Sequence, residues 1–238
     1  MHIVQNVRIM AKGDSVKGNE CQEYFLPEGY VSRTTCVRDG FWTPERISRE
    51  PFNGSYNVFK WISEKENMLA GKSILDVGCG PASKFGLFFP HARITGLDTH
   101  EAIALAKMNN PKGSFLPCDL DDRKSLEELC GMLATFDVIT CIDVIEHVLH
   151  PENILRLIRK CMAPDSVAYI GTLERDRSRG AGCLASPKAE HVREWNQAEF
   201  TAFIENSGFI VDEVKITVQA LRPTVNEKAL RVQTLRCH

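Results

Sequence analysis

From about residue 57 onward, short apolar runs alternate with amphipathic stretches, and this alternation restricts the fold more than any other feature of the sequence. The apolar runs have the length of buried strands, and the amphipathic stretches space their apolar residues as helices do. Strands are expected at 73–78, 93–98, 113–119, 136–143 and 166–173, and helices at 57–69, 82–88, 100–110, 125–133 and 152–162. Such an alternation is typical of a parallel sheet with helices on both faces. The sequence therefore predicts an α/β fold.

The last part of the chain follows a different pattern. A helix is expected at 197–207, and two strands at 209–216 and 228–235 follow it with too few residues between them for a crossover helix. Because parallel neighbours need such a crossover, the last two strands should pair antiparallel. We therefore expect a seven-stranded, mostly parallel sheet whose last strand is antiparallel.

Two regions of the chain differ in the regularity of their residue pattern. Residues 1–56 are irregular, with recurring glycine and proline and with aromatic residues that follow no clear period. At roughly 150 residues per domain, the 238 residues amount to one domain with an appendage. We expect residues 57–238 to form the domain, and residues 1–56 to form an N-terminal extension that packs on the sheet and acts as a lid over the acceptor site. The polar segment 174–195 is expected to be a loop on the same side.

Composition and charge exclude several classes of protein. The formal net charge is −2, so the chain has no overall basic field with which to hold a nucleic-acid backbone. The nine cysteines are scattered without zinc-site spacing, which predicts reduced thiols and no metal site. No apolar run approaches the roughly 18 residues of a membrane span, and the N-terminus lacks a signal-peptide pattern. We expect a soluble, cytoplasmic protein that binds no nucleic acid and has no membrane span.

A glycine-rich turn follows the first expected strand. Gly78 and Gly80 flank Cys79 there, and Asp76 precedes the turn. Residues without a Cβ allow a ligand to approach the backbone closely. Alone, the turn is a weak indication of a cofactor site, because some such turns are merely tight.

Acidic residues also mark the ends of the next two strands. Asp98 ends the second, 18 residues after Gly80, near the spacing at which a carboxylate meets ribose hydroxyls. Asp119 ends the third, where it can accept a hydrogen bond from an exocyclic amine such as that of adenine. Each aspartate alone is also explained as a helix cap or turn residue. Because the carboxyl ends of parallel strands share one edge, the series predicts a nucleoside site there.

These motifs resemble those of the class I S-adenosylmethionine-dependent methyltransferases. The segments that carry the resemblance are 74–83 (ILDVGCGPAS), 96–98 (GLD), 117–122 (PCDLDD) and 136–155 (FDVITCIDVIEHVLHPENIL). The resemblance covers about residues 57–216, in the family's order and spacing. Within the family, the run 143–148 (DVIEHV) is similar to the ubiquinone-biosynthesis O-methyltransferases. The block 172–209 is more loosely similar to bacterial methyltransferases, many of them tied to sugar or surface-polysaccharide modification.

The resemblance implies a Rossmann-like fold, S-adenosylmethionine as the cofactor and S-adenosylhomocysteine as its product. It implies methyl transfer to an oxygen or nitrogen of a small molecule, with a sugar or glycan precursor as one candidate acceptor. The residues that it places at the cofactor are Asp76, Gly78, Cys79, Gly80, Asp98, Asp119, Leu120, Ile142 and Asp143.

Two histidines are candidates for catalysis. An oxygen or nitrogen acceptor can require removal of a proton, and histidine is the usual base near neutral pH. His147 follows the fourth expected strand, and His191 opens the run HVREW. Each has a second explanation, His147 as a capping or packing residue and His191 as part of a loop held by hydrogen bonds.

Four further residues are candidates for binding the acceptor. Arginine binds phosphate and carboxylate in a bidentate manner, and aromatic rings stack on sugars and flat rings. The candidates are Arg175, Arg193, Trp195 and Tyr30. The alternative is a solvated loop with local ion pairs, above aromatic residues that pack on the sheet.

Two other functions share part of this pattern. A cofactor-binding partner or sensor protein without catalysis would keep the same nucleoside residues. A nicotinamide oxidoreductase is disfavoured, because Ser83 stands where a dinucleotide fingerprint has its third glycine, and Asp76 stands where dehydrogenases usually carry an apolar residue. The sequence leaves the acceptor and the oligomeric state open.

Overall fold

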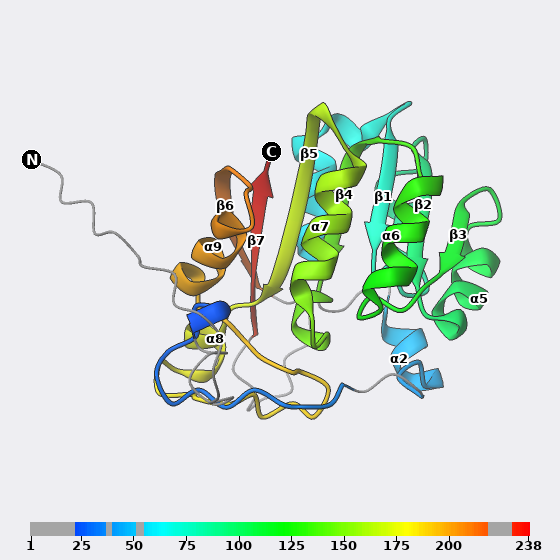
Figure 1. Ribbon diagram of the computed structural model, residues 1–238. Helices are drawn as coiled ribbons and strands as arrows, with labels where there is room; N and C mark the ends of the chain where they lie inside the picture. Colours follow the sequence, from blue (N-terminus) through cyan, green and yellow to red (C-terminus); the bar gives the residue numbers. More distant parts are fainter. Residues whose placement is uncertain (1–21, 37–39, 51–54, 219–229) are drawn as a thin grey trace, which may run out of the picture.

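Seven strands form one sheet in the order β3-β2-β1-β4-β5-β7-β6 in the computed structural model, which describes residues 22–36, 40–50, 55–218 and 230–238 (Figure 1). The strands are β1 Ser73–Val77, β2 Arg93–Asp98, β3 Ser114–Pro117, β4 Phe136–Ile142, β5 Met162–Leu173, β6 Val211–Val218 and β7 Arg231–Cys237. The first five run parallel, and β7 runs antiparallel to both of its neighbours, β5 and β6. The predicted mostly parallel sheet with an antiparallel last strand is therefore confirmed.

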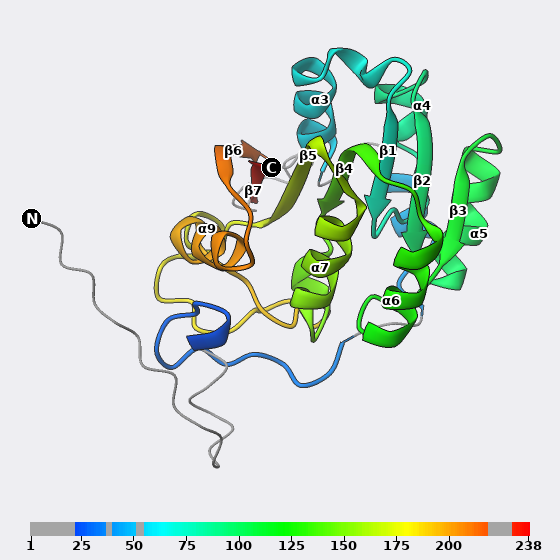
Figure 2. The ribbon, with the colours of Figure 1, turned by 45° about the horizontal axis from the view of Figure 1, so that its top comes forward.

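Helices cover both faces of the sheet (Figure 2). The longer ones are α3 Tyr56–Lys65, α5 His100–Asn109, α6 Arg123–Met132, α7 Pro151–Cys161 and α9 Gln197–Asn206. The short ones are α2 Pro44–Arg49, α4 Phe85–Phe88, α8 Arg175–Arg179, and the 3-10 turns η2 Asn67–Leu69 and η3 Ile145–His147. Residues of α6, α7 and α9 contribute to one apolar core cluster, and residues of α3, α4 and α5 to another. The two clusters supply the buried apolar area that stabilises a three-layer fold.

Some boundaries differ from those expected, each for a local reason. The helix expected at 57–69 ends at Lys65, because Asn67 and Leu69 have left-handed φ values of 50° and 51°. The strand expected at 166–173 begins earlier, at Met162, which pairs with Phe136 of β4. The helix expected at 82–88 is a single turn, α4. Residues 228–229, expected to begin the last strand, lie outside the described residues.

The N-terminal segment lies beside the 174–195 segment at the carboxyl ends of the parallel strands (Figure 1). Backbone N–H groups of Val31 and Arg33 donate to the carbonyls of Leu184 and Val192, at 2.7 and 2.9 Å. The indole N–H of Trp195 donates to the carbonyl of Tyr24 at 2.8 Å. Two segments that are distant in the sequence therefore form one layer over this edge of the sheet.

The predictions of reduced cysteines and of no membrane span can be compared with the described residues. The eight cysteines in this part of the chain form no disulfide. In the same residues, every helix is too short or too polar to cross a bilayer.

Candidate functional site

The turn after β1 depends on glycines in left-handed conformations. Gly78 has φ +76° and Gly80 has φ +52°. A Cβ added to Gly78 would lie 2.2 Å from Cγ2 of Val144, and one added to Gly80 would lie 2.7 Å from the ring of Trp42. Both the backbone conformation and the close neighbours therefore require glycine at these two positions.

The carboxylate of Asp98 joins the end of β2 to this turn. Its Oδ2 accepts the N–H of Gly80 at 2.7 Å, and its Oδ1 accepts the N–H of Thr99 at 2.6 Å. Burial raises the pKa of Asp98 above its usual value. Each carboxylate oxygen can accept a second hydrogen bond. The carboxylate is thus held by the backbone and keeps acceptor capacity for a ligand.

Asp76 and Asp119 lie at the ends of the strands on either side of β2. Asp76 is 3% exposed, and its Oδ1 accepts the hydroxyl of Thr140 at 2.6 Å. Burial raises the pKa of Asp76 to about 7. Asp119 is half-buried, and its Oδ1 accepts the N–H of Asp121 at 2.9 Å. Because β3, β2 and β1 are neighbours, the structure brings the three predicted aspartates to one edge.

The other residues predicted at the cofactor lie around the same edge. Cys79 is buried in the turn, and a Cβ added to Gly96 would lie 2.7 Å from its Sγ. Leu120 is half-buried and packs on the core. Ile142 ends β4, and Asp143 follows it with a left-handed φ of 56°. A non-glycine residue in this conformation stores strain, and such residues cluster at functional sites.

His191 is held by a buried carboxylate. It is 3% exposed, and its Nδ1 lies 2.7 Å from Oε1 of Glu194, which is fully buried. Although burial opposes the shift, hydrogen bonds from His191 and Ser186 lower the pKa of Glu194 to about 2. The close contact with the ionised Glu194 orients the His191 ring, with Nδ1 toward the carboxylate and Nε2 on the other side of the ring.

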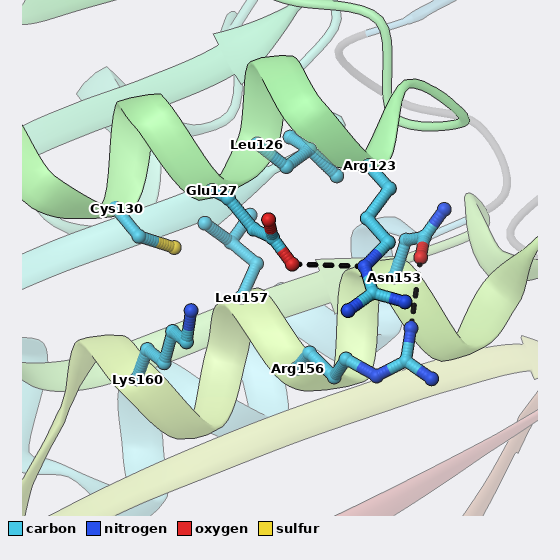
Figure 3. Close-up of a pocket in the computed structure, with 8 residues that line it drawn as sticks. All are labelled: Arg123, Leu126, Glu127, Cys130, Asn153, Arg156, Leu157 and Lys160. Atoms are coloured by element: carbon cyan, nitrogen blue, oxygen red, sulfur yellow. Dashed lines mark hydrogen bonds and ion pairs between the residues drawn. The ribbon is translucent and has the colours of Figure 1, made fainter.

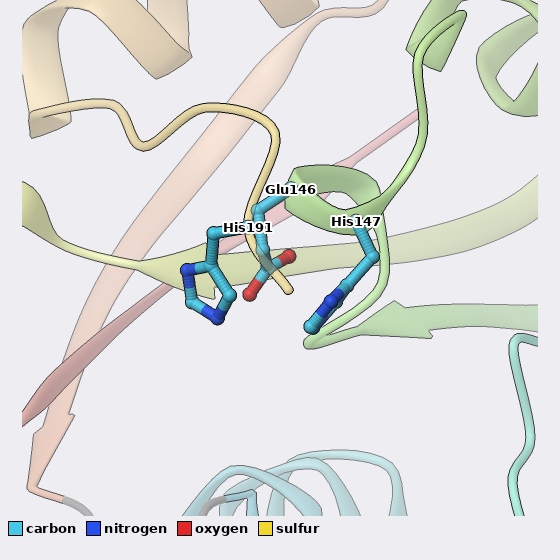
Figure 4. Close-up of side chains that lie close together, drawn as sticks. All are labelled: Glu146, His147 and His191. Carbon is cyan, nitrogen blue, oxygen red and sulfur yellow. The ribbon is translucent and has the colours of Figure 1, made fainter. Parts of the chain in front are cut away.

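His147 lies beside His191, with 4.7 Å between the ring centroids (Figure 4). Its Nδ1 lies 2.9 Å from the carbonyl oxygen of Glu190, to which it donates, and this again leaves Nε2 as the acceptor. Burial and the neighbouring His191 lower the pKa of His147 to about 3. The ring is therefore neutral at physiological pH and a weak proton acceptor, and its predicted catalytic role stays a prediction.

Glu146 is a functional candidate that the sequence did not identify. It directly precedes His147, is 1% exposed, and its carboxylate lies between the two histidine rings (Figure 4). Burial raises the pKa of this carboxyl. The only available signal was its place in the run 143–148, since nothing in the sequence links it to His191.

The four residues predicted to bind the acceptor lie together, but their polar groups bond to the protein. Arg175 forms a bidentate pair with Glu199 at 2.8 Å for both contacts. Arg193 donates to the carbonyls of Val148 and Leu149 at 3.3 and 3.1 Å.

The two aromatic candidates are also engaged. Trp195 is fully buried, and the hydroxyl of Tyr30 accepts the N–H of Glu194 at 2.7 Å. With Arg175 and Arg193, they hold the 174–195 segment on the fold, which is an indirect role. Direct contact of the four with an acceptor stays a prediction.

Residues 40–50 connect the glycine turn to the histidines. Trp42 lies against Gly80 at one end. At the other, Phe41 meets the ring of His147 edge-on, with 5.8 Å between centroids. Nη2 of Arg46 lies 3.2 Å from Oε1 of Glu190.

A buried ion pair anchors the same segment. Glu50, directly after α2, pairs with Lys84, which precedes α4. Residues 40–50 are therefore tied to the turn side and to the histidine side of the site. Phe41 and Trp42 belong to the aromatic N-terminal extension that the sequence predicts as a lid over the acceptor site, and that role stays a prediction.

A shallow groove between α6 and α7 is a separate feature (Figure 3). Nε of Arg123 donates to Glu127 at 2.8 Å, and Nη1 of Arg156 donates to Asn153 at 3.1 Å. The groove shares no residue with the glycine turn or the histidine pair. It is therefore not part of the candidate site.

Comparison with known families and proteins identifies relatives of this chain. A family model described as "Methyltransferase domain" matches residues 57–214. The ubiquinone biosynthesis O-methyltransferase of Pseudomonas syringae pv. tomato is 32% identical over 120 residues, which is 49% of this chain and 50% of that protein. The protein of the same name from Haemophilus ducreyi is 30% identical over 123 residues, which is 49% of this chain and 52% of that protein. The chain spans about half the length of these curated relatives.

Solved structures show the same fold at low sequence identity. Magnesium protoporphyrin IX methyltransferase from Synechocystis PCC 6803, solved with bound SAM, has a TM-score of 0.52 and 14% identity, covering 76% of each chain. A TehB-like SAM-dependent methyltransferase from Corynebacterium glutamicum has a TM-score of 0.51 and 22% identity, covering 74% of this chain and 86% of the other. The predicted Rossmann-like sheet is thereby confirmed.

Proposed function

The chain belongs to the methyltransferase-domain family, and on this premise we propose that it transfers a methyl group from S-adenosylmethionine to an oxygen or nitrogen of a small molecule. The contact that carries the proposal is the hydrogen bond between Asp98 and the glycine turn. The Asp98 carboxylate accepts the N–H of Gly80 and can still accept hydrogen bonds from a ligand. When bound, S-adenosylmethionine supplies a methyl group already activated on a sulfonium, and its departure leaves neutral S-adenosylhomocysteine.

The residues around the turn fit a nucleoside with a positively charged tail. Asp98 would accept hydrogen bonds from the ribose diol, and Asp119 and Leu120 would bracket the adenine. Asp76, ionised above its pKa of about 7, would attract the amino group of the methionine part. The backbone of Gly78, Cys79 and Gly80 would lie along the cofactor, because glycines without a Cβ allow a ligand to approach the backbone closely.

The sulfonium end would face Ile142, Asp143 and the two histidines. Ile142 and Asp143 lie where β4 ends, between the glycine turn and η3. The acceptor would therefore lie on the side of His147 and His191. Alignment of the two reactants alone can supply about 7–11 kcal/mol of the barrier reduction in such a displacement.

Residues 40–50 would act as a lid over both reactants. Their contacts reach from Gly80 to Glu190, so the segment covers the path between the two halves of the site. Phe41 and Trp42 give it an aromatic underside that suits a flat ring or the apolar face of a sugar. Closure by such a segment excludes water from the reacting groups.

Two classes of acceptor are supported. The relatives from Pseudomonas and Haemophilus are ubiquinone biosynthesis O-methyltransferases by name, and the aromatic lid fits a hydroxylated ring. A sugar or glycan precursor is the second class, on the looser likeness of residues 172–209. A cofactor-binding protein without catalysis is the alternative function, which the same cofactor residues would serve.

An acceptor screen tests this proposal. The purified chain is incubated with methyl-labelled S-adenosylmethionine and with separate panels of catechols, hydroxybenzoates and nucleotide sugars. Label in an acceptor, lost on substitution of Asp98 by asparagine, supports methyl transfer and names the class. Tight binding of S-adenosylhomocysteine with no labelled product in any panel would favour the non-catalytic alternative.

A further inference from the structure

One potential metal ligand atom from each of Glu146, His147 and His191 lies within 4.8 Å of the others. Figure 4 shows the carboxylate of Glu146 between the two imidazole rings. Glu146 and His147 come from η3, whereas His191 comes from the segment after β5. The three groups therefore converge from two parts of the fold.

Both rings are oriented by a partner on their far side. His147 donates from Nδ1 to the carbonyl of Glu190, and His191 has Nδ1 at 2.7 Å from Glu194. Histidines that bind metal ions almost always donate their other N–H to a carbonyl or carboxylate, as His147 does, and in His191 a carboxylate lies in close contact with that nitrogen. In each ring, Nε2 is the nitrogen left to bind an ion.

The carboxylate of Glu146 supplies the second, independent observation. The residue is 1% exposed, and its Oε2 has no hydrogen-bond partner among the described residues. An acceptor atom that is buried without a partner is costly and calls for an explanation. A cation between the carboxylate and the imidazoles would satisfy it.

The backbone holds the two ligand-bearing segments together. The N–H of Val192 donates to the carbonyl of Glu146 at 2.7 Å. With the contact of His147 to Glu190, this bond fixes η3 against residues 190–192. The cluster is therefore preorganised by bonds that do not involve the ligand atoms themselves.

We propose that Glu146, His147 and His191 bind one divalent transition-metal ion, of the class of Zn²⁺ or Co²⁺. Two imidazoles and one carboxylate suit such ions better than Mg²⁺ or Ca²⁺, which prefer oxygen ligands. Ligands at about 2.1 Å from a tetrahedral ion lie about 3.4 Å apart, so the cluster must contract by roughly 1.4 Å at its widest. Rotation of the Glu146 side chain can supply part of this movement.

Three protein ligands leave a coordination position open. Because the histidines lie on the acceptor side of the site, an acceptor oxygen could occupy that position. This use of the ion rests on the proposed function, whereas binding of the ion does not. In this arrangement the two histidines act as ligands, which replaces both the predicted role as proton acceptors and the prediction of no metal site.

Titration with Co²⁺ tests the proposal, because a cobalt ion bound by imidazole absorbs visible light. The chelator-treated chain is titrated with CoCl₂ and then with ZnCl₂, beside the variants Glu146→Gln and His191→Ala. The matched control is His150→Ala, since His150 is exposed and lies just beyond η3. S-adenosylhomocysteine binding by each variant shows that it is folded.

We expect one Co²⁺ per wild-type chain, displaced by Zn²⁺. Affinity should fall by about a hundredfold in Glu146→Gln and in His191→Ala, and should stay unchanged in His150→Ala. Equal Co²⁺ binding by Glu146→Gln and the wild type, or no binding by a chain that binds S-adenosylhomocysteine, would overturn the proposal. Co²⁺ binding by a chain that does not bind S-adenosylhomocysteine would instead overturn the proposed function.

Discussion

Nδ1 of His191 lies 2.7 Å from Oε1 of Glu194, and the same carboxylate oxygen accepts the hydroxyl of Ser186 at 2.7 Å. Glu194 also lies 3.4 Å from the guanidinium of Arg179. A fully buried carboxylate with these partners stays ionised and holds the His191 ring in one orientation. Glu194 is therefore a positioning residue: it sets which edge of the His191 ring points into the candidate site.

Substitution Glu194→Gln should lower kcat more than it changes the KM for S-adenosylmethionine. Glutamine keeps the shape but removes the charge that orients the His191 ring, and loss of such an orienting partner costs about ten- to a hundredfold. Steady-state kinetics with a methyl acceptor identified in the acceptor screen measures kcat and the KM for S-adenosylmethionine separately. Glu205→Gln, an exposed change on α9, is the control. A rise in KM with unchanged kcat would contradict the positioning role.

Substitution Gly78→Ala should destabilise the fold and weaken cofactor binding. The added methyl would lie 2.2 Å from Val144 in a left-handed backbone, and such overpacking costs about 1–3 kcal/mol. Gly131→Ala is the opposite case, because Gly131 lies in α6 with no atom within 4 Å of the added methyl. That change should stabilise by about 0.5–1 kcal/mol. Urea denaturation of both variants checks the two signs, and a Gly78→Ala variant as stable as the wild type would refute the strain argument.

The buried Asp76 should make stability depend on pH. Its pKa is raised to about 7 by burial, against about 3.9 in the unfolded chain. Between these values the folded state binds more protons, so this carboxyl's contribution to stability is present below about pH 4 and is lost as the pH rises through about 7. Asp76→Asn, which stays neutral, should gain stability relative to the wild type as the pH is raised from about 5 to about 8. Urea denaturation at both pH values tests this, and parallel curves for the two proteins would contradict it.

Trp42 should report cofactor binding by its fluorescence. Its ring lies against Gly80, at the turn that would hold the cofactor. Trp61 packs edge-on against Tyr169 at 5.4 Å, outside the site. Binding of S-adenosylhomocysteine should change the emission of the wild type and of Trp61→Phe, but not of Trp42→Phe. If Trp42→Phe shows the same emission change as the wild type, residues 40–50 do not cover the cofactor.

The parts of the fold that follow from local sequence rules could be predicted. The antiparallel β7 follows from the short connection after β6, because no crossover helix fits there. The cofactor edge follows from Asp76, Asp98 and Asp119, because each comes at the end of a strand and the strands are neighbours. In both cases the deciding information lies in each strand and in the connection that follows it.

The acceptor side could not be predicted, because its contacts join distant segments. The charge of Arg175 and Arg193 suggests an anion site. In the fold, however, Arg175 pairs with Glu199, and Arg193 donates to the carbonyls of Val148 and Leu149, which the sequence does not show. Glu146 and His191 are distant in the sequence, so no local metal-ligand spacing marks their cluster. Only the folded chain brings η3 against residues 190–192.

Calorimetric titration with S-adenosylhomocysteine and with NAD, on the wild type and on Asp98→Asn, tests the central claim most directly. The account predicts one site per chain for S-adenosylhomocysteine, no binding of NAD, and a loss of affinity of about tenfold or more in Asp98→Asn, equal to at least about 1.4 kcal/mol. Binding of NAD, or equal S-adenosylhomocysteine affinity in Asp98→Asn and the wild type, would contradict it.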